Sequence, residues 1–183
     1  MTIYEELKKD HQTVLALLDQ LIASEKAGPE PWGRLVQQIR DELVPHARAE
    51  EAILYNALRD ADESKDVVLH AYREHAQAET VLRGLQISDA LDLTWVGAAK
   101  QLREDLAHHI AEEEGKVFTA AKRAFSDEEA TAMGAAFVQM KPRVRGENFA
   151  ETTAEMIANM LPTRLRESVR KFVADAGTPR RSA

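Results

Sequence analysis

The sequence predicts an all-α protein: an antiparallel up-down-up-down four-helix bundle followed by a C-terminal helical extension. The chain has 183 residues with few helix breakers, 8 glycines and 6 prolines. It is rich in alanine, leucine, glutamate, arginine and glutamine, which favour helix, and has almost no alternating β-branched stretch. Apolar residues recur at helical spacing over four long segments, and the short connections between these segments favour antiparallel neighbours.

Breaks in the helical pattern separate the four predicted bundle helices, which are expected over about residues 3–22, 32–58, 66–85 and 91–125. The first break is the segment 27–31, which contains glycine and proline, and the second is the polar segment 60–65. Residues 86–89 are expected to form a turn. Residues 1–125 are therefore assigned to the bundle domain.

Residues 126–183 are assigned to the extension and its tail. Ser126 and Glu129 have the spacing of a capping box, so a further helix is expected to begin there, and Pro142 is expected to stop it. The last seven residues are expected to be disordered. Further helical pattern is present at about 150–161 and 163–173.

An apolar stripe in the extension contains Met133, Phe137 and Met140. Two uses of this stripe are open. Packing against the bundle of the same chain is favoured, and a homodimer contact is the alternative.

Composition and charge exclude several classes of function. The chain contains no cysteine, which excludes disulfides, cysteine-bound zinc or iron–sulfur clusters and a cysteine nucleophile. With 31 acidic and 24 basic side chains, the net charge is −7, so nucleic acid is not expected as a partner. No segment has the pattern of a signal peptide or of a membrane span, so a soluble, cytoplasmic protein without a membrane partner is expected.

One histidine interrupts the apolar stripe of each predicted bundle helix. Positions three, four or seven residues apart share a helix face, at about 100° per residue. By this rule His70 and His108 share their faces with polar side chains and are expected at the surface. The inward histidines, with the glutamates that follow three of them by four residues, are His11, His46, Glu50, His75, Glu79, His109 and Glu113.

These inward side chains indicate a metal site. A single inward histidine is usually a hydrogen-bonded core residue, but here three buried carboxylates would need compensation, and no lysine or arginine lies on the stripes. Nitrogen and oxygen donors suit iron or manganese, with zinc as a further alternative. Seven donors exceed the needs of one octahedral ion, so two ions fit better. Two divalent ions carry +4 against three carboxylates, and an oxide or hydroxide bridge could offset the remaining +1.

Two other metal motifs are absent from the sequence. No histidine has a glutamate three residues before it, as in ferritin-like di-iron bundles, and the zinc peptidase motif His-Glu-x-x-His does not occur. Over about residues 1–125 the arrangement instead resembles the hemerythrin-like (HHE cation-binding) family. The matching segments are Lys9-Asp10-His11, Pro45-His46-Ala47-Arg48-Ala49-Glu50-Glu51, Glu74-His75 and His108-His109-Ile110-Ala111-Glu112-Glu113-Glu114.

The resemblance implies a non-haem di-iron centre with an oxo or hydroxo bridge, manganese or zinc being less favoured. It implies that the ligands are His11, His46, Glu50, His75, His109 and Glu113, with Glu50 and Glu113 bridging. Two departures concern the carboxylates. Oxygen-carrying hemerythrins have a second histidine at the position of Glu79, and an aspartate at that of Glu114. A seventh ligand, Glu79, is our hypothesis; a more anionic ligand set favours the oxidised metal and weakens the case for reversible O₂ carriage.

Three functions follow as expectations. The first is a di-iron protein that handles O₂, peroxide or nitric oxide, with an oxidoreductase that metabolises peroxide or nitric oxide as its enzymatic form. The second is an iron or oxygen sensing or storage module whose metal state controls partner docking through residues 126–183. The third is a structural metal in a closed, unreactive site.

Three residues near the predicted ligands have more than one interpretation. Pro45 is expected to bend its helix and could thereby aim His46. Tyr72 shares the face of His75, while Tyr55 lies farther round its own helix. Core packing is the favoured role for both tyrosines.

Overall fold

The structure, a computed structural model, describes residues 1–26, 29–60, 65–88 and 94–145. All regular secondary structure in these ranges is helical, which confirms the all-α prediction. None of the described helices is long and apolar enough to cross a membrane. The disordered tail and the additional helical pattern expected in the extension lie outside the described residues, at 150–161, 163–173 and 177–183.

The predicted bundle helices are present, and two of them contain a π-helical turn, in which the backbone hydrogen bonds span five residues. In chain order the bounds are α1 Ile3–Ala23, a 3-10 turn Ser24–Lys26, α2 Pro29–Glu50, a π-helical turn Glu51–Tyr55, α3 Asn56–Asp60, α4 Lys65–Ile87, α5 Trp95–Glu112, a π-helical turn Glu113–Val117, α6 Phe118–Ala124 and α7 Asp127–Arg145.

Side-chain caps start α1 and α7. Thr2 and Glu5 form a capping box, in which the Glu5 carboxylate accepts from Thr2 N at 2.8 Å. The predicted box at Ser126 is also present: the Glu129 carboxylate accepts from Ser126 N at 2.8 Å, and Glu129 N donates to Ser126 Oγ at 3.3 Å. Each box satisfies backbone N–H groups that the first turn of a helix leaves without partners.

Proline lies inside two helices. Pro45 has no N–H to donate to the carbonyl of Asp41, four residues earlier. That carbonyl oxygen accepts a hydrogen bond from Arg145 Nε of α7 at 3.1 Å instead.

The prediction that Pro142 stops its helix was wrong, since α7 continues to Arg145. This bond and the ion pair between Arg145 and Glu42 at 2.8 Å anchor the last turn despite the proline.

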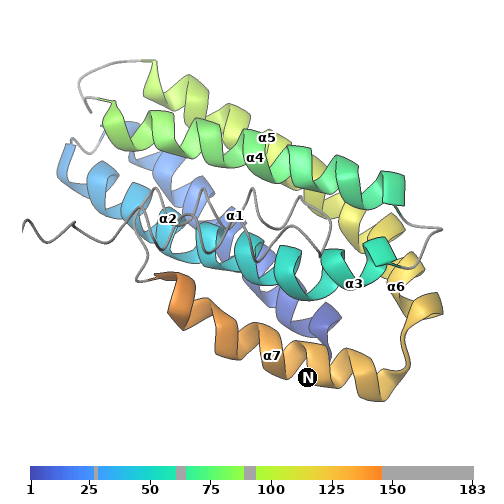
Figure 1. Cartoon of the computed structure of the whole chain (residues 1–183). Coiled ribbons are helices and arrows are strands. Elements are labelled where there is room, and N and C mark those ends of the chain that lie inside the picture. Colours follow the sequence, from blue (N-terminus) through green and yellow to red (C-terminus); the bar gives the residue numbers. More distant parts are fainter. Residues whose placement is uncertain (27–28, 61–64, 89–93, 146–183) are drawn as a thin grey trace, which may run out of the picture.

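Four helical rods surround a common core, and a fifth helix lies against two of them. α1 contacts α2 and α5, and α4 contacts the same two helices, so contacts run round all four. α7 packs on α1 and α2, along the side of the molecule opposite α4 and α5 (Figure 1).

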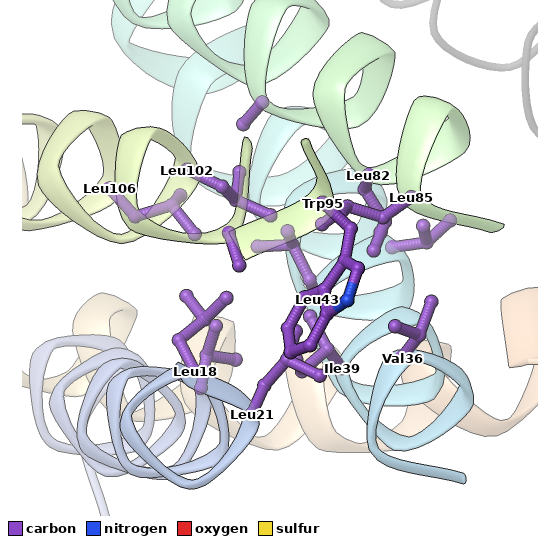
Figure 2. Close-up of a cluster of buried hydrophobic side chains, with 14 of the residues drawn as sticks. Leu18, Leu21, Val36, Ile39, Leu43, Leu82, Leu85, Trp95, Leu102 and Leu106 are labelled. Atoms are coloured by element: carbon purple, nitrogen blue, oxygen red, sulfur yellow. The ribbon is translucent and has the colours of Figure 1, made fainter. Parts of the chain in front are cut away.

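The core contains two hydrophobic clusters. The tryptophan cluster, shown in part in Figure 2, gathers apolar side chains of α1, α2, α4 and α5 around Trp95. The tyrosine cluster contains Tyr4, Tyr55 and Tyr72. Along α1 and α4 the residues of the tyrosine cluster come first, and along α2 and α5 those of the tryptophan cluster come first. In all four helices the inward histidine lies between the two clusters, so the predicted site is a polar layer inside an apolar core.

The stripe predicted on the extension packs against the bundle of the same chain, which was the favoured alternative. Phe137 is 1% exposed, and Met133 and Met140 pack against the tyrosine cluster. At Gly134 the helix approaches the N-terminus so closely that a Cβ would lie 2.5 Å from the Met1 carbonyl oxygen. The homodimer contact stays a prediction.

Candidate metal centre

Four helices each place one buried histidine in the polar layer. His11 comes from α1, His46 from α2, His75 from α4 and His109 from α5, and each is only 3% or 4% exposed. The side chains of Glu50 and Glu113 are completely buried in the same layer. Six of the seven predicted ligands are therefore brought together.

The Nδ1 nitrogen of each histidine contacts a carboxylate. This carboxylate belongs to another helix or to the π-helical turn that follows another helix. The four Nδ1 contacts are His46 to Asp10 at 3.3 Å, His75 to Glu51 at 3.1 Å, His109 to Glu74 at 2.9 Å and His11 to Glu114 at 3.1 Å. These pairs link α1 to α2, the π-helical turn after α2 to α4, α4 to α5, and the π-helical turn after α5 back to α1. Since a carboxylate accepts hydrogen bonds, each Nδ1 donates, and this sets the tautomer of the neutral ring.

The other nitrogen of each histidine faces the two central glutamates. His46 Nε2 and His75 Nε2 lie 3.6 and 3.4 Å from Glu50 Oε2. His11 Nε2 and His109 Nε2 lie 3.1 and 3.9 Å from Glu113 Oε2. A neutral ring whose Nδ1 is protonated presents the lone pair of Nε2 toward these carboxylate oxygens. His75 Nε2 and His109 Nε2 also lie 3.1 Å from each other, so the layer gathers groups that can all donate electron pairs.

The missing positive charge is what a metal ion would supply. Within the described part of the chain, none of the four oxygens of Glu50 and Glu113 has a hydrogen-bond partner. Buried polar groups are normally paired, and leaving an ionised carboxylate unpaired in the core is expensive. Glu50, His75 and His109 offer donor atoms within 4.8 Å of one another. Histidine bonded through its other nitrogen to a carboxylate is the usual arrangement at metal sites, so these residues fit a cation.

Protonation follows the same geometry. Burial lowers the pKa of His46 to about 4, the nearby His11 adding to the effect, and burial also lowers the pKa of His75. Both rings are therefore neutral at pH 7. Burial raises the pKa of Glu50 well above its ordinary value, and the charge of Glu113 raises it further. Without metal, protons thus partly replace the cation in this layer.

Glu79, the seventh predicted ligand, is placed apart from this group. Its carboxylate accepts hydrogen bonds from Arg48 and Arg83. The expectation that no basic side chain faces inward was wrong, because Arg48 is 1% exposed and lies between Glu79 and Glu51. A guanidinium with five donors can serve two carboxylates at once.

The carboxylates that hold the histidines were not predicted from the sequence. Each of them is adjacent in sequence to a predicted ligand, which is a signal that could have been used. They are Asp10, Glu51, Glu74 and Glu114. Adjacent side chains of an α-helix point about 100° apart, so a residue next to a predicted ligand is not expected to face the same site. Two of the four, Glu51 and Glu114, lie in the π-helical turns, which widen the helix where successive glutamates enter the layer.

Aromatic side chains line one side of the layer. The Tyr55 ring stacks on His75 with a centroid distance of 5.4 Å and an angle of 24°. Burial, with the charges of Glu113 and Glu50, raises the pKa of Tyr55 well above its ordinary value. Tyr72 donates instead to Asn56 Oδ1 at 2.9 Å. Both tyrosines are fully buried, as the favoured core-packing role requires, and Tyr55 is the one that contacts a predicted ligand.

The extension reaches the layer through α7, which the sequence did not suggest. Lys141 Nζ donates to Asp10 Oδ2 at 2.5 Å, the same oxygen that contacts His46 Nδ1. The edge of Phe137 meets the His46 ring at a centroid distance of 5.7 Å. α7 therefore contributes to the surroundings of one of the four histidines.

Sequence comparisons relate the chain to known proteins. A curated relative, a DNA nickase of Nostoc sp. strain PCC 7120, is 24% identical over 145 residues. The match covers 79% of this chain and 40% of the nickase, so the chain spans less than half of that relative. No solved structure matches the chain significantly. Residues 2–121 match the hemerythrin HHE cation binding domain, and the chain belongs to that family.

Proposed function

We propose that the protein binds two iron ions, as a non-haem di-iron centre, between α1, α2, α4 and α5. The proposed ligands are His11, His46, Glu50, His75, His109 and Glu113, with the two glutamates bridging. The observation that carries the proposal is the pair of completely buried glutamates whose Oε2 oxygens face the Nε2 nitrogens of four histidines. Glu79 is not included, because Arg48 and Arg83 already bind its carboxylate.

The number of donors supports two ions rather than one. Four imidazole nitrogens and four carboxylate oxygens exceed the six positions of an octahedral ion, and nitrogen with oxygen donors suits iron better than a closed zinc site. Two divalent ions against the two carboxylates of Glu50 and Glu113 leave +2. The surrounding carboxylates of Asp10, Glu51 and Glu74 lower this positive potential and increase the basicity of the imidazoles, which favours the oxidised metal.

We propose that the centre handles O₂, peroxide or nitric oxide, and that turnover of peroxide or nitric oxide is its enzymatic form. Bound iron would supply redox equivalents and an open coordination position. The two apolar clusters on either side of the layer exclude bulk water, and Tyr55 places a buried phenol against His75. The order in which each helix meets the clusters supports an antiparallel up-down-up-down bundle as the scaffold.

A sensing or storage module is the second candidate function, and α7 is the observation in its favour. Lys141 and Phe137 connect the extension to His46, directly or through Asp10. A change of metal state that moves His46 would therefore reach a segment outside the residues that match the family. Nicking of DNA is not proposed, since the chain carries a net charge of −7 and matches 40% of the relative named for it.

Elemental analysis and an optical spectrum test the proposal. We expect about two irons per chain in untagged protein and a near-ultraviolet charge-transfer band that responds to peroxide. Protein that binds no metal after anaerobic loading with Fe(II) would contradict the di-iron centre. Repeated turnover with peroxide or nitric oxide would support catalysis. A single stoichiometric reaction accompanied by a change in protease sensitivity of the extension would support sensing.

A further inference from the structure

A second group of histidine and carboxylate side chains lies on the surface formed by α4 and α5. His70 Nε2 is 3.4 Å from Glu74 Oε1 and 3.5 Å from Glu112 Oε2. Donor atoms of these three residues lie within 4.8 Å of one another. His70 is half-exposed, and Glu74 and Glu112 are partly buried. The group is thus open to solvent on one side.

The separations suit shared coordination better than hydrogen bonding. Both exceed the usual N–H···O distance of about 2.9 Å. Zinc binds histidine nitrogen and carboxylate oxygen at about 2.0–2.2 Å, so neighbouring donors of a tetrahedral ion lie about 3.3–3.6 Å apart. The distances from His70 to Glu74 and to Glu112 fall in that range. These three side chains could therefore bind one ion without a change of backbone.

The same spacing in sequence occurs on both helices. His70 precedes Glu74 by four residues, and His108 precedes Glu112 by four, which places each pair on one helix face. His108 Nε2 is 3.8 Å from Glu112 Oε1 and can serve as a fourth donor. A cavity of about 250 Å³ is lined by His70, Glu74 and His108 and leaves space for an ion with its waters. Lys116 also contacts Glu112, at 2.6 Å, but its side chain is 62% exposed and free to move aside.

We propose that His70, Glu74 and Glu112 form a second, solvent-facing site for a divalent cation, with His108 as an additional donor. This site uses none of the ligands of the buried centre and does not depend on the proposed function. It lies beside that centre, because the second oxygen of Glu74 is 2.9 Å from His109 Nδ1. An ion bound at the surface would therefore share one carboxylate with the surroundings of the buried histidines.

Zn(II) titration of the metal-free full-length chain tests the proposal. With nitrogen-15 in the histidines, we expect the His70 ring signals to shift as one equivalent of Zn(II) binds. They should shift equally in His11→Ala, which removes a ligand of the buried centre. The variant His70→Ala should lose one equivalent of Zn(II) and leave the buried histidine signals able to respond. Glu112→Gln should weaken binding at the surface site at least about tenfold.

Glu128→Gln is the matched control, since it removes an exposed carboxylate from α7, which packs on α1 and α2 and is away from the group. It should leave Zn(II) binding unchanged. Unmoved His70 signals at about 1 mM Zn(II), or equal affinities for Glu112→Gln and Glu128→Gln, would overturn the proposal. If Zn(II) shifts the His70 ring signals but not those of the buried histidines, the result would support the surface site and count against the buried metal centre. The two proposals can therefore fail separately. His70→Ala alters a half-exposed residue and should fold normally.

Discussion

Replacing Glu50 by glutamine should stabilise the metal-free protein and weaken the metal-loaded one. The Glu50 side chain is completely buried, and neither of its oxygens has a hydrogen-bond partner among the described residues. Glutamine is neutral beside Glu113 without taking up a proton, and it supplies an N–H toward His75 Nε2, which lies 3.4 Å from the glutamate oxygen. Replacing buried ionic groups by neutral ones stabilises proteins by about 1–4 kcal/mol, so we expect the free energy of unfolding of the metal-free variant to rise by about that much.

The stability advantage of the metal-free Glu50→Gln variant should increase with pH. Because the pKa of Glu50 is raised in the folded state, the wild-type protein loses stability as pH rises from the ordinary glutamate value through the folded value. Glutamine does not titrate, so the advantage of the variant should grow over the same range. Urea denaturation followed by circular dichroism measures it, with a midpoint shift of about 0.5–2 M if the slope is about 2 kcal/mol per molar.

Glu79→Gln is the matched control, with the opposite expected sign. Its partner Arg48 is 1% exposed and would keep Glu51 as a charged partner. Weakening a buried ion pair in this way should cost about 2–4 kcal/mol. Metal content and the optical spectrum should stay unchanged, because Glu79 is bonded to arginine. A loss of metal in this variant would restore Glu79 as a ligand.

Iron loading should reverse the order of stabilities. A ligand that binds only the folded state stabilises it by about 2.7 kcal/mol at a hundred times its dissociation constant. Glu50→Gln removes one of the proposed bridging ligands and should lose most of that gain, so we expect the wild-type protein to be the more stable of the two. A metal-free Glu50→Gln protein that is less stable than wild type by more than about 1 kcal/mol would refute the reasoning, because Glu50 would then have a partner without metal.

Three further measurements address the surroundings of the layer. Asp10→Asn should lower metal affinity about 10–100-fold in a chelator competition, since Asp10 orients His46; an unchanged affinity would remove that role. Gly134→Ala should cost about 1–3 kcal/mol in urea denaturation, because its Cβ would lie 2.5 Å from the Met1 carbonyl oxygen; a neutral result would mean that α7 docks less closely. Metal binding should strengthen as pH rises and release protons, measured by calorimetry in two buffers. Burial lowers the pKa of His11, but the nearby carboxylates of Glu113 and Glu114, each 3.1 Å from a ring nitrogen, raise it overall. His11 and Glu50 must therefore lose protons to bind metal, whereas His46 is already neutral.

Helical periodicity was enough to predict which histidines face the core. His11, His46, His75 and His109 are all 3% or 4% exposed, and His70 and His108 are exposed, as their faces required. The rule works because the direction of a side chain depends on its own helix, whose repeat of about 3.6 residues is local. The same rule could not detect the π-helical turns at Glu51–Tyr55 and Glu113–Val117, because it assumes one helical repeat along the whole segment.

The sequence by itself therefore determined the all-α class and which of the predicted ligands point inward. Only the tertiary structure decided what each inward group meets. Glu79 lies beside Arg48 of another helix, and Asp10 contacts His46 rather than its sequence neighbour. Such pairings depend on how far each helix is shifted and rotated against the next. Those offsets come from the packing of the two apolar clusters, which brings together residues far apart in the chain.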